Sequence, residues 1–150
     1  MSLPAETLPA SFPVTTFDND VAYEELVVVS DVGFIARCDC HGLPYTGLAT
    51  IGYLPGDRIV GLSELARLVE HHAMEGADPV RLAGVLADAL EETLCTPGVG
   101  VVVDAGPACG DTDVDGAHQI TTATRGRLRE HSTARSEFLV RARPRRRRHT

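Results

Sequence analysis

Two consecutive helix-type segments, set between groups of strand-type segments, constrain the fold of this 150-residue chain most strongly. The first helix is predicted over residues 63–75, with Ser63 as its N-cap and apolar residues at helical spacing. Asp78 and Pro79 provide the N-cap and the first-turn proline of a second helix, which stops before the Pro97-Gly98 pair. Such a helical hairpin must bury its two apolar stripes against another layer of structure.

The segments on either side of the helices have the composition of β-strands, rich in β-branched residues and bounded by turn residues. Their order predicts the α+β class, with a four-stranded antiparallel sheet that carries the helical hairpin on one face. The other face needs cover, and because the chain has few aromatic residues we expect an oligomer to supply it. The predicted strands are residues 21–37, 46–54, 59–60, 99–103 and 118–128. A short helix follows them, with Ser132 as its predicted N-cap and Val140 near its end.

The chain is predicted to hold one domain, residues 21–142, between two flexible ends. Residues 1–20 are proline-rich and lack the cationic and apolar pattern of a signal peptide, so we interpret them as an arm. Residues 143–150 form an arginine-rich tail that we expect to be solvated. No apolar run approaches the length of about 18 residues that a membrane span needs, so we expect a cytoplasmic protein.

The distribution of charge restricts the function. All 14 cationic residues are arginines, which excludes chemistry that needs a lysine, such as Schiff-base formation or a P-loop. Residues 1–140 hold 8 arginines against 21 acidic residues, a net charge of −13, which argues against nucleic acid on the main surface. Only the tail is basic enough to tether the chain to nucleic acid or to another anionic surface.

The densest chemical signal is the segment Cys38-Asp39-Cys40-His41. Two thiolates and an imidazole within four residues suit Zn²⁺, and four cysteines in a chain of cytosolic type favour metal or thiol chemistry over disulfides. Cys109 lies in a later loop and would complete three ligands, the number that leaves a position open in catalytic zinc sites. The alternative is a pair of buried structural thiols beside a surface histidine.

The residues around this segment resemble the GTP cyclohydrolase I family. The family motif Cys-Glu-His-His-x-x-Pro-Phe corresponds to residues 38–45, and its Gly-Leu-Ser-Lys-Leu-Ala-Arg helix start corresponds to residues 61–67. The family strand Pro-x-Gly-Val-x-Val-x-x-Glu-Ala leads to the family's distal cysteine, and here residues 97–105 lead to the distal Cys109. The closing pattern Arg-Glu-x-x-x-x-Arg-x-Glu-Phe is present at residues 129–138.

This resemblance covers about residues 25–142 and implies the tunnelling fold, assembled into a ring-shaped homo-oligomer with active sites between subunits. It implies that Cys38, His41 and Cys109 are the zinc ligands, and all three are present. Zinc in such a site lowers the pKa of bound water to about 7 and so supplies the reactive species.

The rest of the family's active-site pattern is altered in this chain. Cys40 stands where the family has a proton-transferring histidine, and Pro107 replaces a second histidine. Glu64 and Asp113 stand where the family has a phosphate-binding lysine and arginine, and residues 79–81 replace the Gln-Glu-Arg segment that holds guanine. A triphosphate beside these carboxylates would meet like-charge repulsion.

We therefore expect a zinc-dependent, cyclohydrolase-like enzyme that hydrolyses or rearranges a C–N bond of a small heterocyclic or amide-type substrate other than GTP. The alternatives are GTP cyclohydrolase I itself, which converts GTP to dihydroneopterin triphosphate and formate, and a non-catalytic zinc-binding relative. Cys40 is the predicted catalytic residue beside the zinc, with simple packing or zinc ligation as alternatives. The residues predicted to contact substrate are Ser63, Glu64, Asp113 and His118.

Three further features receive structural interpretations. His71 and His72 are expected to be exposed on the first helix, and Cys95 at the end of the second helix is expected to be structural. Residues 111–116 match the opening of an EF-hand loop, but the loop's twelfth position is Thr122 instead of glutamate. A solvated acidic turn is therefore the favoured interpretation of these residues.

Overall fold

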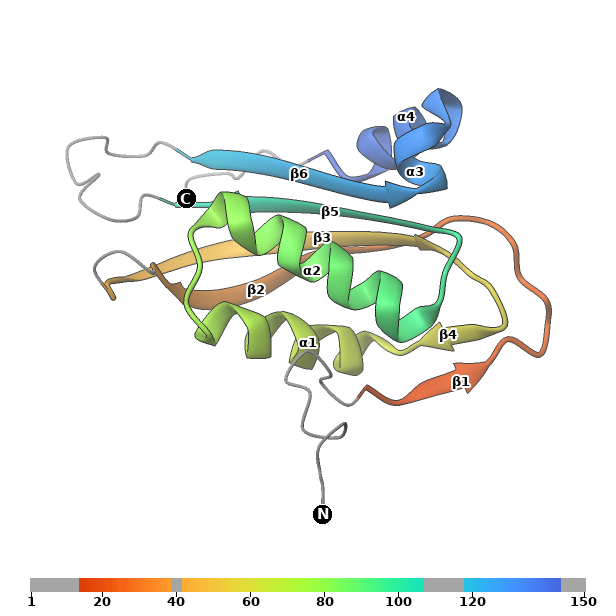
Figure 1. Cartoon of the computed structure of the whole chain (residues 1–150), viewed down its shortest axis with the longest axis horizontal. Coiled ribbons are helices and arrows are strands. Elements are labelled where there is room, and N and C mark those ends of the chain that lie inside the picture. The colour runs from red at the N-terminus through yellow and green to blue at the C-terminus, as the bar shows by residue number, and fades with distance from the viewer. Residues whose placement is uncertain (1–13, 39–41, 107–117, 144–150) are drawn as a thin grey trace, which may run out of the picture.

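The computed structural model of the protein describes residues 14–38, 42–106 and 118–143. These residues form a four-stranded antiparallel sheet with helices on both faces and a separate two-stranded ribbon (Figure 1). The elements in chain order are β1 (Thr16–Asp18), β2 (Val27–Arg37), β3 (Pro44–Leu54), β4 (Arg58–Val60), α1 (Leu62–Met74), α2 (Pro79–Leu94), β5 (Gly98–Ala105), β6 (Gln119–Gly126), α3 (Arg127–Glu130) and α4 (Ser132–Arg141).

The main sheet has the order β2-β3-β5-β6, and every neighbouring pair is antiparallel. Helices α1 and α2 lie together over one face of it (Figure 1). The predicted α+β class, with a helical hairpin on one face of an antiparallel sheet, is therefore confirmed.

The main core lies between this sheet and the helical hairpin. Side chains of a strand alternate between the two faces of a sheet, so every second residue of β3 and β5 points at the helices. Each fully buried Val, Leu or Ile contributes about 1.5–3 kcal/mol relative to an exposed one. The strands supply Ala49, Ile51, Tyr53, Val99, Val101 and Val103, and the helices supply Leu65, Leu68, Leu82, Leu86 and Leu90.

A smaller core covers part of the second sheet face. The ring of Phe138 in α4 is fully buried over Gly52 and Gly100, which are cross-strand partners in β3 and β5. A Cβ atom on either glycine would lie 2.5 Å from the ring, so only glycine admits this close approach. We expected an oligomer to cover this face of the sheet. Helix α4 of the same chain covers the part around Gly52 and Gly100, so the expectation is wrong for that part. Ile35 and Ile120, nearer the other end of the same face, remain exposed.

Several element boundaries differ from the sequence predictions. Thr16–Asp18 form β1 and pair with β4, although residues up to 20 were expected to be a flexible arm. Arg58 holds this ribbon together through hydrogen bonds to Thr16 and an ion pair with Asp18. The strand was not predicted because these contacts join residues about 40 positions apart and leave no local sequence pattern.

The helix caps are predicted correctly at one of three sites. Asp78 caps α2, with its carboxylate accepting the N–H of Arg81 at 2.8 Å. The N-cap of α1 is Gly61 instead of Ser63, and that of α4 is His131 instead of Ser132. Neither of these two caps has a side-chain hydrogen bond, so a serine near a helix start was not a sufficient signal.

Within the described ranges, no helix combines the length and the apolar character needed to cross a membrane.

Candidate functional site

Cys38 follows the last residue of β2 and begins a tight turn into β3. Its N–H donates to the carbonyl oxygen of Leu43, and the N–H of Gly42 donates to the carbonyl oxygen of Cys38, both at 2.9 Å. Gly42 has a φ of +67°, a conformation that favours glycine and lets the chain close the turn. The side chain of Cys38 is buried in the main core with 1% of its surface exposed. Two hydrogen bonds therefore hold the backbone of Cys38, and its thiol lies in a water-poor environment.

The end of β5 lies at the same end of the sheet. Gly47 in β3 pairs with Ala105 in β5, and the N–H of Gly106 donates to the carbonyl oxygen of Thr46 at 2.9 Å. The chain thus leaves β5 one strand away from the turn that holds Cys38 (Figure 1). The other predicted residues of this region, Cys40, His41, Cys109 and Asp113, lie outside the described residues.

His118 lies at this end of the sheet, immediately before β6. Its Nδ1 atom is 2.8 Å from Oδ1 of Asp104, and the His118 side chain is 44% exposed. Asp104 belongs to the sheet face opposite the helices, whereas Cys38 packs in the core on the helix side. Asp104 was not among the residues predicted from the sequence, although it occupies the glutamate position of the family strand that precedes the distal cysteine.

The turn after α1 ties the helical hairpin to the Cys38 end of the sheet. The N–H of Ala77 donates to the carbonyl oxygen of Arg37 at 3.0 Å, and the buried hydroxyl of Tyr45 donates to the carbonyl oxygen of Ala77 at 2.7 Å. The C-terminal end of α1 is therefore beside the strand that carries Cys38.

Ser63 and Glu64 lie at the other end of α1, far from Cys38. Helix α1 has 13 residues, so its two ends are separated by about 20 Å at 1.5 Å per residue. The structure therefore places Cys38 and His118 at the same end of the sheet, but beside its two outer strands, β2 and β6. Ser63 and Glu64 of the same chain lie at the far end of α1.

Glu64 has partners of its own. Its Oε1 atom accepts the N–H of Thr15 and an N–H of Arg67, both at 3.1 Å, and its side chain is 18% exposed. Ser63 is exposed and makes no capping hydrogen bond.

His72 differs from the sequence prediction. Only 8% of its surface is exposed, because it lies on the face of α1 that packs on the sheet, whereas both histidines were expected to be solvent-exposed. His71, one residue earlier, is partly buried. Within the described part of the chain, the one group of three metal-ligating side chains is His71, His72 and Glu75.

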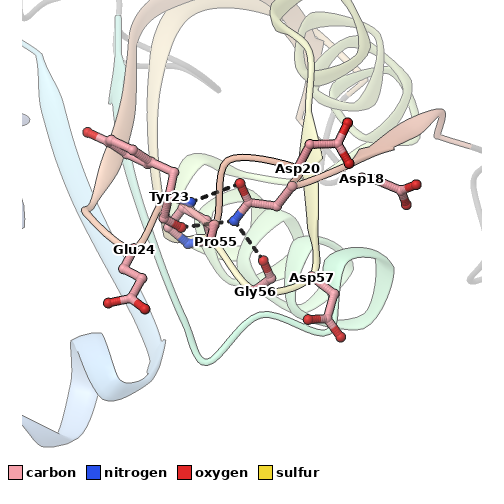
Figure 2. Close-up of a pocket in the computed structure, with 9 residues that line it drawn as sticks. Asp18, Asp20, Tyr23, Glu24, Pro55, Gly56 and Asp57 are labelled. Carbon is pink, nitrogen blue, oxygen red and sulfur yellow. Dashed lines mark hydrogen bonds between the residues drawn. The ribbon is translucent and has the colours of Figure 1, made fainter.

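A polar hollow of about 410 Å³ lies at the opposite end of the sheet from Cys38, where β3 turns into β4 (Figure 2). Asn19 organises it by donating to the carbonyl oxygens of Tyr23 and Gly56, each at 2.9 Å. Its acidic side chains point away from one another, so they do not form one cation site (Figure 2). These side chains are Asp18, Asp20, Glu24 and Asp57.

The arrangement of the sheet and the helical hairpin defines the chain as a tunnelling-fold protein. The archaeosine synthase QueF-Like superimposes with a TM-score of 0.59 at 16% identity, over 69% of this chain and 96% of that one. E. coli dihydroneopterin aldolase, solved in complex with neopterin, superimposes with a TM-score of 0.55 at 14% identity, over 68% of this chain and 99% of that one.

Sequence similarity identifies the family within this fold class. The family model described as GTP cyclohydrolase I matches residues 5–143. The protein named GTP cyclohydrolase 1 in Dehalococcoides mccartyi is 36% identical over 91% of this chain and 71% of its own length, and that of Halalkalibacterium halodurans is 40% identical over 87% and 71%. The relative of the same name in Gloeobacter violaceus is 37% identical over 80% of this chain, which spans only 58% of that protein. The chain belongs to the GTP cyclohydrolase I family.

Proposed function

We propose that this protein is a zinc-dependent GTP cyclohydrolase that acts on GTP itself. The observation that carries the proposal is the identity of 36–40% to proteins named GTP cyclohydrolase 1, over 87–91% of this chain. This similarity favours GTP as the substrate. The altered residues had predicted a different heterocycle, and we now prefer GTP to it.

The surroundings of Glu64 weaken the electrostatic argument against GTP. Its carboxylate already accepts hydrogen bonds from Thr15 and Arg67, so the charge that it presents to a phosphate is partly compensated. The guanidinium of Arg67 is one turn further along α1 and is 56% exposed. An arginine in this position supplies a cation that a phosphate group can contact, in a chain that has no lysine.

The donor set fits zinc. Cys38 offers a buried thiol in a turn closed by two backbone hydrogen bonds, and soft sulfur and imidazole donors are those that zinc prefers. Together with Cys38, His41 and Cys109 would hold the ion. When bound, zinc supplies Lewis-acid activation of water and of the carbon–nitrogen bond under attack.

His118 is the described residue best suited to hold a proton near this end of the sheet. The Asp104 carboxylate lies at hydrogen-bond distance from Nδ1 of His118 and so orients the ring. The other ring nitrogen, Nε2, can then contact a substrate group. Its exposure allows Nε2 to meet a substrate, in a chain where two other histidines of the family pattern are replaced by Cys40 and Pro107.

The separation of Glu64 from Cys38 supports an active site that two subunits share. Both positions belong to the family's active-site pattern, yet Glu64 lies near the start of α1, and Cys38 lies beside the other end of this helix, which is about 20 Å long. A ring-shaped homo-oligomer, in which one subunit supplies the Cys38 end and its neighbour the start of α1, would bring them together.

The direct test is incubation of the zinc-loaded protein with GTP. We expect release of formate and formation of a fluorescent pterin, because ring opening of GTP followed by closure yields both. ATP serves as the control nucleotide, since it carries the same triphosphate without the guanine edge. Absence of both products from GTP, together with turnover of another heterocycle, would contradict the proposal.

Replacement of Glu64 by lysine tests the role of this position in phosphate binding. We expect the KM for GTP to fall by about fivefold, which corresponds to the roughly 1 kcal/mol that a newly formed exposed ion pair contributes. Glu70→Lys is the matched control, because it makes the same charge change at an exposed position of the same helix. If both variants change the KM equally, residue 64 has no specific contact with the phosphates.

A further inference from the structure

Two histidines and a glutamate converge at the C-terminal end of α1. His71 Nε2 lies 3.3 Å from Oε2 of Glu75, and His72 Nδ1 lies 3.4 Å from Oε1 of the same carboxylate. One ligand atom from each of the three residues lies within 4.8 Å of the other two. The two imidazoles therefore approach the two oxygens of a single carboxylate.

A purely structural role does not account for the burial of the polar His72 side chain. It is buried, and neither of its ring nitrogens has a hydrogen-bond partner, because its approach to Glu75 lacks hydrogen-bond geometry. A buried polar group without a partner costs about 1–3 kcal/mol. Burial and the neighbouring His71 lower the pKa of His72, although Glu75 opposes this shift. Burial therefore disfavours the charged ring, and the neutral imidazole has a nitrogen lone pair to offer.

We propose that His71, His72 and Glu75 bind one divalent transition-metal ion of the Zn²⁺ class. Zinc bonds of about 2.0–2.2 Å to imidazole nitrogen and carboxylate oxygen, at tetrahedral angles, place neighbouring ligand atoms about 3.4 Å apart. Each imidazole nitrogen lies at this separation from one of the two Glu75 oxygens, and one donor atom from each of the three residues lies within 4.8 Å of the others. Two imidazoles and one carboxylate are also a donor set of known catalytic zinc sites.

The position of the cluster adds electrostatic support. The C-terminus of a helix carries a partial negative charge that favours cations, and the three residues occupy the last turn of α1 and its C-cap. An open cleft of about 420 Å³, bordered by His71, Glu75, Glu70, Arg67 and Met74, lies beside them. The cleft leaves room for water or another ligand to complete the coordination of the ion.

A bound ion would act where the helical hairpin joins the sheet. It would satisfy Nδ1 of His72 and fix the ring in the tautomer that carries its hydrogen on Nε2. Ala77, two residues after Glu75, donates a hydrogen bond to Arg37, the neighbour of Cys38 in sequence. The donor set shares no residue with the ligands predicted at Cys38, so the two sites can be tested separately.

Titration of the metal-free protein with Co²⁺ tests the proposal. Cysteine ligands give Co²⁺ an intense thiolate charge-transfer absorption, whereas imidazole and carboxylate ligands give only weak ligand-field bands. We expect wild-type protein to bind one equivalent of Co²⁺ at this cluster without thiolate absorption. A second equivalent that does show thiolate absorption would report the separate site at Cys38. Glu75→Gln and His71→Gln should each weaken binding at the cluster by at least about tenfold.

Glu70→Gln is the matched control, because it removes the same charge from the same helix and the same cleft without changing a proposed ligand. It should leave the affinity unchanged, and Cys38→Ser should also retain the equivalent that lacks thiolate absorption. Signals of the His71 and His72 rings in NMR spectra of wild-type protein should shift as diamagnetic Zn²⁺ is added. The proposal would be overturned if the wild type binds no equivalent of Co²⁺ without thiolate absorption. It would also be overturned if Glu75→Gln and Glu70→Gln bind that equivalent with equal affinity.

Discussion

Replacing Cys38 with serine should remove one equivalent of zinc per chain and lower GTP turnover by at least about a hundredfold. A serine hydroxyl stays protonated at neutral pH and is a poor zinc ligand, whereas a cysteine binds as thiolate. Residues that merely support a metal ligand already cost about 10–100-fold when they are replaced, so loss of a ligand itself should cost at least as much. Zinc is measured by elemental analysis after desalting, and turnover is measured as formate released.

Cys95→Ser is the matched control for this experiment. Cys95 is exposed at the C-terminal end of α2, in a left-handed conformation, and α2 leads there into the start of β5, away from Cys38. This variant should retain both the zinc and the activity of the wild type. Circular dichroism checks that both variants keep the fold. Equal zinc content and equal turnover in the two variants would show that Cys38 is not a zinc ligand.

Replacing Phe138 with alanine should lower the free energy of unfolding by about 3–5 kcal/mol, the usual cost of removing a buried phenylalanine ring. The ring is fully buried against Gly52 and Gly100, and no other side chain of α4 is buried. Its loss therefore opens a cavity and detaches α4 from the sheet. Urea unfolding followed by circular dichroism measures the change. Val140→Ala, at a position of α4 that is 67% exposed, is the control and should change stability by less than about 1 kcal/mol.

The same contact makes a further variant informative. Gly100→Ala would place a Cβ atom 2.5 Å from the Phe138 ring, so we expect it to destabilise wild-type protein. In Phe138→Ala protein the ring is absent, and the added methyl group should cost less. A coupling of at least about 1 kcal/mol between the two changes is therefore expected. Additive effects would mean that the ring does not pack on this glycine.

The main features of the fold were predictable because they depend on local patterns. The apolar stripes of α1 and α2 repeat with the period of a helix, and the runs in β2 and β5 are rich in β-branched residues. The cover of the second sheet face was not predictable, because α4 buries a single side chain, Phe138, over glycines far away in the sequence. A glycine pair in two strands contains no signal that identifies its aromatic partner.

For the candidate site too, some features were predictable from the sequence and others depend on the tertiary structure. The sequence by itself predicted the helical hairpin and the strands of the main sheet, since periodicity depends on residues close together in the chain. It also supplies the thiol and imidazole side chains that we propose as zinc ligands near Cys38. Only the tertiary structure decided that Glu64 is paired with the N–H of Thr15, 49 positions away, that Asp104 holds His118, and that His72 is buried with its ring nitrogens unsatisfied. Burial, pairing and the effective charge of a side chain depend on which distant segments pack around it, and that packing is a property of the whole fold.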